Sequence, residues 1–541
     1  MAEIYTKEQL NNLSQEDLVQ TILSMQEHLE AMQKNYESLD HTMQLMLEQL
    51  ADAKRHRFGR SSEQLEDNGQ LTLDELDSSY AIFNEAEVLY DLLDEEEVTP
   101  KPRGKKKKGK REEDLKDLPV EVISHQMSEK DLKEFFGDEE YKQLPDEIQR
   151  RYVYHPAKVC VEEHHIEVYS GKESERMIKA THPKALLKGS LASSSLMAGI
   201  INGKYVNALP FYRLEKTFQN DGVNVTRKAM ADWSVKVSER YLSLLYDHIR
   251  DQLIQAPILQ ADETPVLVNK DGRDAGSKSY MWVYRTSRFD TKHPIILYEY
   301  QKTRKADHPR EFLKDFSGVC VTDGYQVYHT LEGERQDLTI AGCWAHARRR
   351  YDEALKALPK DKRKDCLANT ALKMIRAIYK ANEALDSFPS EERLQKRQTI
   401  VKPLVEAYFA WVKEKHSKVL KGTKTEKGMQ YSINQEKYLK TFLDYPDVPM
   451  DNNAAEQSIK NFCVGKKNWL FCDTLSGAKS SAIIYSIVET AKANNLKVYE
   501  YINHILSVLP EHMEDTDYSF IDDLLPWSEK IPEECKKQTK K

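Results

Sequence analysis

Apolar residues near the N-terminus recur at alternating spacings of four and three, which is typical of a coiled coil. The apolar positions are Leu18, Ile22, Met25, Leu29, Met32, Tyr36, Leu39, Met43, Met46 and Leu50. A helix docked on its own protein drifts toward a period of about 3.6, so this 3.5 period favours a partner helix. Residues 1–57 are therefore predicted to form a coiled coil through which the chain self-associates. Intramolecular docking is the alternative.

A helical pattern returns in residues 184–251, where short turns separate three segments. The segments are 190–203, 208–219 and 224–249. Thr226 is a suitable N-cap for the third segment, which opens with Arg227 and Lys228. The pattern predicts helix-turn-helix-like DNA-binding helices with these two cations at an exposed start. A plain helical bundle explains the periodicity almost as well.

From residue 252 the pattern changes to short apolar runs of strand character separated by helical stretches. The order strand, strand, strand, helix, strand, helix, strand, helix predicts a multidomain α/β protein with a mixed sheet. Residues 351–446 instead carry apolar positions at helical spacing, which predicts an all-α insertion. The catalytic core would then consist of 252–350 and 447–510, and residues 511–541 would form a C-terminal tail.

Three carboxylates stand at informative places in this pattern. Asp262 and Asp323 follow strand-like runs, in QADETP and VTDGY, and strand ends are where α/β sheets commonly build sites. Glu456 follows in PMDNNAAEQSIK, in the first turns of a helix that Asp451 or Asn452 can cap. Three such carboxylates could hold Mg²⁺, and two ions roughly 4 Å apart can promote phosphodiester chemistry. Spacing alone does not establish the site, because a lone Glu in this position is usually a surface residue.

Six motifs occur in a characteristic order: QADETP, VTDGY, CWAHARRRY, PMDNNAAEQSIK, VGKKNWLF and SIVETAKANNL. With FGRSSEQ and GSLASSSLMAGIINGKYVNALPFYRLEKTF upstream, they closely resemble the insertion sequence 66 family, a branch of the DDE transposases. The resemblance implies a ribonuclease-H-like catalytic domain in which Asp262, Asp323 and Glu456 bind two Mg²⁺ or Mn²⁺ ions. It also implies binding of terminal inverted repeats, hydrolysis of the end phosphodiesters and transfer of the 3′-hydroxyl ends into target DNA. Its expected partners are double-stranded DNA and small accessory proteins of the same element.

Further candidate DNA contacts are Arg348 and Arg349, and Lys466, Lys467 and Trp469 in VGKKNWLF. Cys343 and His346 form a C-x-x-H pair between the fifth strand-like run and the helix that carries Arg348 and Arg349. The pair is incomplete as a structural zinc site, since four ligands are needed and no second pair with suitable spacing lies nearby. The resemblance implies that these two residues shape the site. A half-buried Cys and a hydrogen-bonded His are the alternative.

Residues 118–183 depart from the family pattern. Related proteins usually carry a small zinc-binding module with CxxC pairs there, whereas Cys160 is the only cysteine in this segment. Four of its five histidines could in principle make a substitute site, but their spacing matches no zinc pattern. They are His155, His164, His165 and His182. We therefore expect a degenerate, metal-free module and no zinc.

The net charge of −8 is unevenly distributed. Residues 62–98 hold thirteen Asp or Glu and no Lys or Arg, whereas eight of the eleven residues in 101–111 are basic. We interpret residues 58–117 as an acidic then basic flexible linker. Its cations Lys105, Lys106, Lys107 and Lys108 are expected to contact DNA phosphates without sequence preference. A merely solvated linker is the alternative.

Length and composition limit the number of structural units and the cellular compartment. A chain of 541 residues suggests about three to four structural units. Seven cysteines without pairing logic indicate a reducing compartment, and no segment resembles a membrane span or signal peptide. A cytoplasmic, nucleoid-associated protein is expected, with no membrane partner. Two other functions fit part of the pattern: a DNA-binding regulator without chemistry, and a nuclease without strand transfer.

Overall fold

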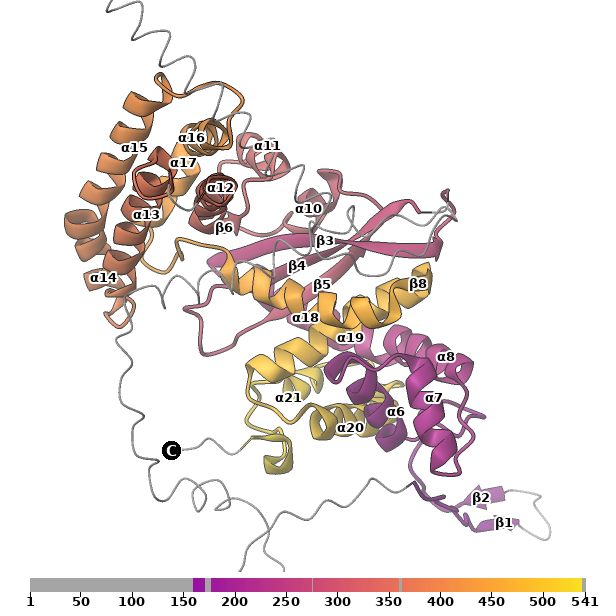
Figure 1. Ribbon diagram of the computed structural model, residues 1–541. Helices are drawn as coiled ribbons and strands as arrows, with labels where there is room; N and C mark the ends of the chain where they lie inside the picture. The colour runs from indigo at the N-terminus through magenta and orange to yellow at the C-terminus, as the bar shows by residue number, and fades with distance from the viewer. Residues whose placement is uncertain (1–158, 171–176, 275, 360–361, 538–541) are drawn as a thin grey trace, which may run out of the picture. The chain divides into compact units, whose positions relative to one another are not determined.

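The computed structural model describes residues 159–170, 177–274, 276–359 and 362–537, and their main feature is a mixed sheet (Figure 1). Its strands are β3 (Ile258–Lys270), β4 (Lys278–Thr286), β5 (Ile296–Gln301), β6 (Gly318–Thr322), β7 (Leu338–Gly342) and β8 (Phe471–Thr474). The strand order is β5-β4-β3-β6-β7, and β8 pairs with the last residues of β3. β4 runs antiparallel to β3 and β5, whereas β6 and β8 run parallel to β3, and β7 runs parallel to β6. The carboxyl ends of β6 and β7 therefore meet at one edge, beside the middle of β3.

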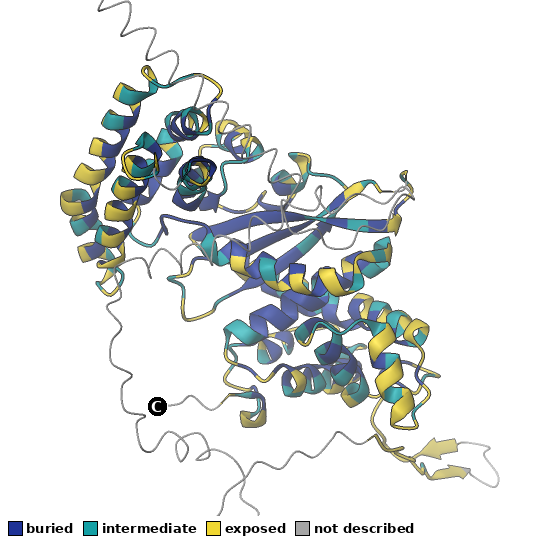
Figure 2. Cartoon of the chain, in the orientation of Figure 1, coloured by how far each residue is buried: buried dark blue, intermediate teal, exposed yellow. Residues whose placement is uncertain are grey.

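Helices connect these strands in the predicted order. They are α10 (Asp307–Phe312) after β5, α11 (Gln326–Glu334) after β6 and α12 (Trp344–Ala357) after β7. In β3 every residue from Ile258 to Thr264 is buried, because both faces of this strand are covered. Figure 2 shows β3, β4 and β5 as largely buried. A strand covered on both faces usually reads as a continuous apolar run, but the buried residues of β3 include Gln260, Asp262, Glu263 and Thr264.

Two long helices from the end of the chain complete the sheet. They are α18 (Asn453–Trp469), which packs on β3 and β4, and α19 (Leu475–Ala493), which packs along β5. Ser486 and Thr490, one turn apart on α19, accept the backbone N–H groups of Tyr298 and Ile296. The Thr490 hydroxyl also donates to the Ile296 carbonyl oxygen. These bonds satisfy backbone groups at the open edge of β5, where an uncovered strand would invite pairing with another chain.

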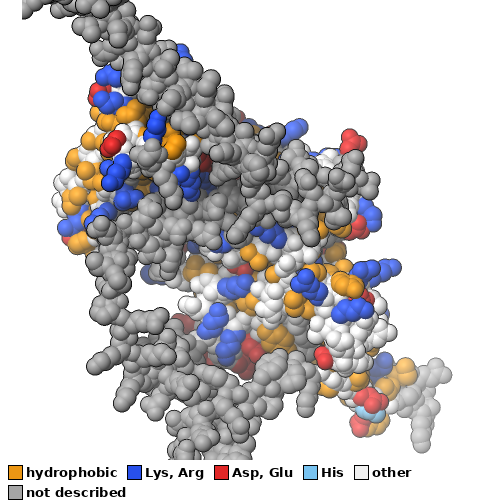
Figure 3. Space-filling model, in the orientation of Figure 1, with side chains coloured by type: hydrophobic (Ala, Val, Ile, Leu, Met, Phe, Trp, Pro, Cys, Tyr) orange, Lys and Arg blue, Asp and Glu red, His pale blue; other side chains and the backbone are white. Residues whose placement is uncertain are grey.

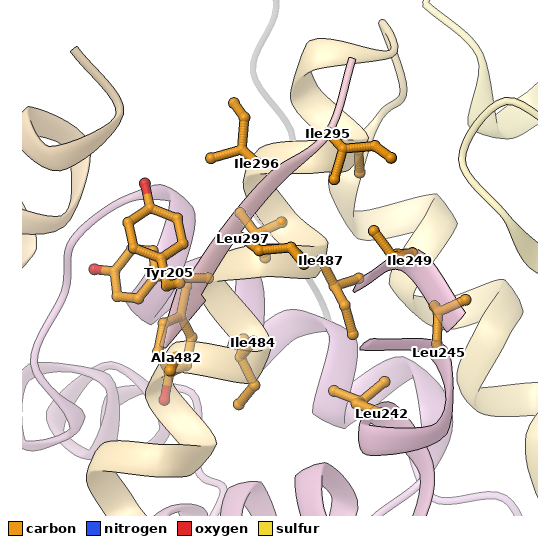
Figure 4. Close-up of a cluster of buried hydrophobic side chains, with 14 of the residues drawn as sticks. Tyr205, Leu242, Leu245, Ile249, Ile295, Ile296, Leu297, Ala482, Ile484 and Ile487 are labelled. Carbon is orange, nitrogen blue, oxygen red and sulfur yellow. The ribbon is translucent and has the colours of Figure 1, made fainter. Parts of the chain in front are cut away.

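The helices upstream of the sheet agree with the predicted segments. They are α6 (Ser194–Ile201), η1 (Asn202–Val206), α7 (Phe211–Asn220), α8 (Arg227–Val237), η2 (Ser238–Leu242) and α9 (Ser243–Ile254). Thr226 is the N-cap of α8 and its hydroxyl accepts the N–H of Ala229, as predicted. Figure 4 shows the apolar cluster that joins this region to the sheet, with Leu245 and Ile249 facing β5 and α19. Before α6 lies an exposed antiparallel hairpin of β1 (Val168–Ser170) and β2 (Met177–Lys179).

Every element described between α12 and α18 is helical, in agreement with the predicted insertion. These elements are α13 (Leu367–Glu383), α14 (Ser390–Lys396), η4 (Arg397–Val401), α15 (Lys402–His416), α16 (Lys424–Asn434), α17 (Glu436–Lys440) and η5 (Thr441–Leu443). They share an apolar core with α12. After α19 the chain continues through α20 (Val498–Val508), η6 (Leu509–His512), α21 (Ile521–Leu524) and η7 (Glu533–Cys535).

Several predictions lie outside the described residues. They concern the coiled coil of 1–57, the linker of 58–117 with Lys105 to Lys108, and most of the module at 118–183. No helix among the described residues is long and apolar enough to cross a membrane.

Candidate active site

Asp262 lies in the middle of β3 with its side chain buried against neighbouring acids. Its Oδ1 accepts the backbone N–H of Glu263 at 2.8 Å. Burial, followed by the negative charges of Glu263 and Asp323, raises the pKa of Asp262 well above its usual value. A carboxyl group held so close to other carboxylates is an unfavourable arrangement unless a cation compensates it.

Asp323 comes directly after β6 and is half-buried. The parallel register pairs Gln260 with Val321, so continuing each strand by two residues brings Asp262 and Asp323 side by side. The Oδ1 of Asp323 accepts the N–H of Tyr325 at 2.9 Å. This turn requires Gly324, whose φ of 90° is unfavourable for other residues and whose missing Cβ leaves room for the Tyr431 hydroxyl.

Glu456 lies in the first turns of α18, on the helix that covers the Asp262 face of β3. Gln260 and Thr264 share that face with Asp262, because side chains alternate along a strand. Gln260 Nε2 donates to Asn452 Oδ1 at 3.2 Å, and Thr264 Oγ1 lies 3.5 Å from Cys463 Sγ. Glu456 stands one turn after Asn452 and two turns before Cys463. The contacts on both sides therefore bring it over the part of β3 that carries Asp262.

Asp451 and Asn452 were both predicted as possible caps of α18, and the structure shows what each side chain does. Asn452 is the N-cap residue, but its side chain makes no capping bond. It instead accepts from Gln260 and donates to the Ala261 carbonyl oxygen at 2.8 Å. Asp451 Oδ1 accepts the N–H of Asn453, so Asp451 supplies the helix-start bond. Asn452 thus fixes α18 to β3 next to Asp262.

Glu456 also faces α12, the helix that follows β7. Its Oε1 lies 3.6 Å from His346 Nδ1 and its Oε2 lies 4.0 Å from Arg349 Nη2. Cys343 precedes α12 and its Sγ accepts the N–H of Asn452 at 3.2 Å. The potential ligand atoms of Cys343, His346 and Glu456 all lie within 4.8 Å of one another. α18 therefore brings a third potential ligand to the C-x-x-H pair, where a structural zinc site needs four.

A fourth acid lies on the opposite face of β3. Glu263 is buried, and Arg304 Nε donates to its Oε1 at 2.6 Å. Burial and the charge of Asp323 raise the pKa of Glu263 to about 7, and Arg304 opposes this shift. The Arg304 guanidinium also stacks over the Tyr325 ring at 3.9 Å. The sequence contained no signal for Arg304, because it lies in an ordinary polar stretch after β5.

The predicted DNA contacts lie in different environments. Arg227 and Lys228 are exposed at the start of α8, and Arg227 stacks on Tyr212 at 5.8 Å. Arg348 and Arg349 are half-buried on α12, where Arg349 faces Glu456. Figure 3 shows Lys and Arg side chains on one face of the described residues, interspersed with acidic and apolar ones.

At the end of α18 the three predicted contacts separate. Lys466 is buried, and its ammonium group donates to the Pro265 carbonyl oxygen at 2.8 Å. This inward placement does not support a direct DNA contact for Lys466. Lys467 is exposed, whereas Trp469 is half-buried and its ring centroid lies 6.5 Å from that of Tyr205.

Comparison with known proteins gives matches along most of the chain. Residues 189–480, which contain Asp262, Asp323 and Glu456, match the Transposase IS66 family. Residues 45–123 match a family described as Transposase C of IS166 homeodomain, and residues 486–527 match the IS66 C-terminal element. The first match alone spans more than half of the chain.

Similar proteins occur in Sinorhizobium fredii. Uncharacterized protein y4qI is 28% identical over 372 residues, covering 66% of this chain and 67% of the relative. Uncharacterized protein y4jD is 24% identical over 360 residues, covering 65% of this chain and 69% of the relative. The family matches, which include both the site and the C-terminal element, show that the chain belongs to the insertion sequence 66 family of transposases.

Proposed function

We propose that this transposase binds the terminal inverted repeats of its element, hydrolyses the end phosphodiesters and transfers the freed 3′-hydroxyl ends into target DNA. The proposal rests on the placement of three carboxylates in the fold. Asp262 and Asp323 lie side by side, and α18 holds Glu456 over the face that carries Asp262. The family match spans all three residues.

The acidic cluster fits hard divalent cations. Burial and then the charges of neighbouring carboxylates raise the pKa of Asp262, so a bound dication would offset the cost of its negative charge. The available donors from Asp262 and Asp323 are oxygen atoms, which Mg²⁺ and Mn²⁺ prefer. Two such ions, when bound, would activate the attacking oxygen and stabilise the leaving oxygen. We assign their binding to Asp262, Asp323 and Glu456.

The sheet topology supports a ribonuclease-H-like core. Three antiparallel strands, β3, β4 and β5, are followed by the parallel strands β6 and β7, with α10 before β6 and α11 between β6 and β7. In this arrangement the carboxylates come from a central strand, the end of its parallel neighbour and a later helix. The helices α13 to α17 would then interrupt the core between its second and third acids.

Glu456 is favoured over Glu263 as the third acid. Glu263 points to the face opposite Gln260 and Thr264, and Arg304 already neutralises it. Glu263 therefore acts as a positioning residue for the turn at Asp323. Arg304, which it binds, also accepts a hydrogen bond at its carbonyl oxygen from the Tyr325 hydroxyl. Tyr325 in turn donates its N–H to Asp323. This chain of contacts fixes the turn that presents Asp323.

DNA would contact the exposed basic groups of the protein. Arg227 and Lys228 present two cations at the start of α8, where they can contact phosphates. Arg349 is close enough to Glu456 to orient its carboxylate before DNA arrives. Self-association through the N-terminal coiled coil, contacts from Lys105 to Lys108 and the accessory proteins remain predictions.

The decisive test is a strand-transfer reaction. Purified full-length protein is incubated with labelled element ends, Mg²⁺ or Mn²⁺, and a target plasmid. Joined products that Asp323→Asn abolishes would support the proposal. Binding without cleavage would indicate a regulator, and cleavage without joining would indicate a nuclease.

A further inference from the structure

The site contains a second set of potential metal ligands that shares Glu456 with the acidic cluster. Cys343, His346 and Glu456 offer a sulfur, a nitrogen and an oxygen within 4.8 Å of one another. Mg²⁺ does not use thiolate ligands, whereas Zn²⁺ is commonly held by this combination of atoms. Cys343 is fully buried and Glu456 nearly so, while His346 is partly exposed.

The distances fit a tetrahedral ion after a small adjustment. Zn–S bonds of about 2.3 Å and Zn–N and Zn–O bonds of about 2.1 Å place tetrahedral ligands roughly 3.3 to 3.7 Å apart. His346 Nδ1 and Glu456 Oε1 already lie 3.6 Å apart. The remaining ligand atoms lie within 4.8 Å of one another, so they need to approach by at most about 1 Å, which side-chain rotation can supply.

The surrounding contacts orient the three ligands. The Asn452 N–H donates to Cys343 Sγ, and the Trp344 N–H next to it donates to the Met450 carbonyl oxygen at 3.0 Å. These two bonds clamp the start of α12 to the segment that leads into α18. Arg349 lies near Oε2 of Glu456, which leaves Oε1 directed toward His346. Such neighbouring groups commonly set the orientation and affinity of metal ligands.

We propose that Cys343, His346 and Glu456 form a binding site for Zn²⁺ that inhibits the transposase by holding Glu456 toward α12. The inhibitory part rests on the proposed function, because it assumes that Glu456 completes the Mg²⁺ site. Three protein ligands leave the fourth position of the ion for water or another small ligand. Zn²⁺ outcompetes Mg²⁺ at nitrogen and sulfur ligands, so low Zn²⁺ would act in the presence of excess Mg²⁺.

The first test measures binding directly, on chelator-treated full-length protein. Zn²⁺ affinity is determined by competition with a chromophoric chelator, and Co²⁺ substitution reports a thiolate ligand through its charge-transfer absorption. Cys343→Ser and His346→Ala should each weaken Zn²⁺ binding by at least about tenfold. Cys343→Ser should also remove the thiolate absorption. Ser can still accept the Asn452 N–H, and a thermal melt of the metal-free variant checks that it folds.

The matched control is Cys160→Ser, because Cys160 is exposed and lies near His164 and His165 in sequence. The proposal expects Cys160→Ser to bind Zn²⁺ and absorb as the parent does. It is overturned if the parent shows no thiolate absorption with Co²⁺, or if Cys343→Ser binds Zn²⁺ as tightly as the parent.

The second test measures inhibition, with each variant normalised to its own rate in Mg²⁺ alone. The Zn²⁺ concentration that halves end cleavage should rise at least about tenfold in Cys343→Ser and stay unchanged in Cys160→Ser. If the parent cleaves DNA but Zn²⁺ bound at Cys343 leaves cleavage unchanged, the inhibitory role fails and the proposed function stands. If no variant cleaves DNA although Cys343 binds the ion, the proposed function fails and the metal site stands.

Discussion

Helices α8 and α18 both carry charges that the sequence marks as functional, yet the structure uses them in opposite ways. At the start of α8, Arg227 and Lys228 are exposed. At the two ends of α18, Glu456 and Lys466 are buried. Charges in water can meet a large partner such as DNA, whereas buried charges must be matched by the protein or by a small ion. The comparison therefore favours the proposal that α8 contributes to DNA binding and α18 to the site and its stability.

The largest effect is expected on DNA cleavage, from a substitution at the buried start of α18. Glu456→Gln preserves shape but removes a negative charge from the proposed metal cluster, as Asp262→Asn does. Each should lower Mg²⁺-dependent end cleavage by at least about a hundredfold, since the metal supplies several kcal/mol and 1.36 kcal/mol is tenfold in rate. A cleavage assay and a gel shift on the same DNA measure the two functions separately.

Binding of element ends should survive in both variants, because Arg227 and Lys228 on α8 are expected to contact the DNA and neither variant changes them. Asp473→Asn is the control, since Asp473 pairs with Lys270 at the far end of β3. It should cleave as the parent does. Near-parental cleavage by Glu456→Gln would remove Glu456 from the triad and make Glu263 or Asp451 the next candidate.

The next effect concerns stability at the other end of α18. Lys466→Met retains the length of the side chain but leaves the Pro265 carbonyl oxygen without its donor. A buried acceptor that loses its partner costs about 1–3 kcal/mol, so the free energy of unfolding should fall by that amount. Lys467→Met, at the exposed neighbouring position, should change it by less than about 0.5 kcal/mol. Urea titrations of both variants measure the difference.

Equal stability of the two variants would contradict the inward role of Lys466. A loss of DNA affinity in Lys466→Met, with no loss of stability, would instead restore the sequence-based prediction of a DNA contact. The two outcomes are separable because binding and unfolding are measured independently.

These two helices also show what could be predicted from sequence. The strands of the sheet follow from continuous apolar runs, and Thr226 was recognisable as a cap because capping is a local interaction. The sequence left Asp451 and Asn452 open as caps, because it does not show that the Asn452 side chain bonds to Gln260 on a distant strand. The DNA contact of Lys466 stays a prediction. Its burial could not be foreseen, because neighbouring lysines look alike in sequence and only the packing of α18 on β3 turns one of them inward.

The site shows the same limit. The carboxylates could be proposed from their motifs, but their convergence depends on strand pairing and on a helix that returns after a long insertion. The contact of Glu456 with His346 joins residues far apart in the chain, so no spacing rule predicted it. Arg304 was missed for the same reason, because only the folded sheet brings it to Glu263.

A smaller effect is expected at the exposed start of α8. The double variant Arg227→Ala, Lys228→Ala should weaken binding to element ends by about tenfold at physiological salt. It should also reduce the slope of log affinity against log salt by up to about 2, since each phosphate contact releases about one counterion. Fluorescence anisotropy over a range of salt concentrations measures both quantities.

Lys236→Ala is the matched control, because Lys236 lies at the other end of α8 and pairs with Asp232 at 2.7 Å. Its salt slope should equal that of the parent. A parental slope in the double variant would show that α8 does not present its first residues to DNA, and would favour the plain helical bundle.

The smallest expected effect is a pH dependence of the free energy of unfolding, which distinguishes the buried Lys466 from an exposed lysine. Burial lowers the pKa of Lys466 below its usual 10.5. The folded state therefore releases this proton at a lower pH than the unfolded state, so the contribution of Lys466 to stability is complete above pH 10.5 and falls as the pH decreases through the folded pKa. The stability difference between the parent and Lys466→Met should accordingly widen as the pH rises toward 10.5. Urea unfolding of the parent, Lys466→Met and Lys467→Met at several alkaline pH values measures it, and Lys467→Met should follow the parent. A difference between the parent and Lys466→Met that narrows with rising pH would mean that the folded protein favours the charged form of Lys466, as expected for a solvated or DNA-facing lysine.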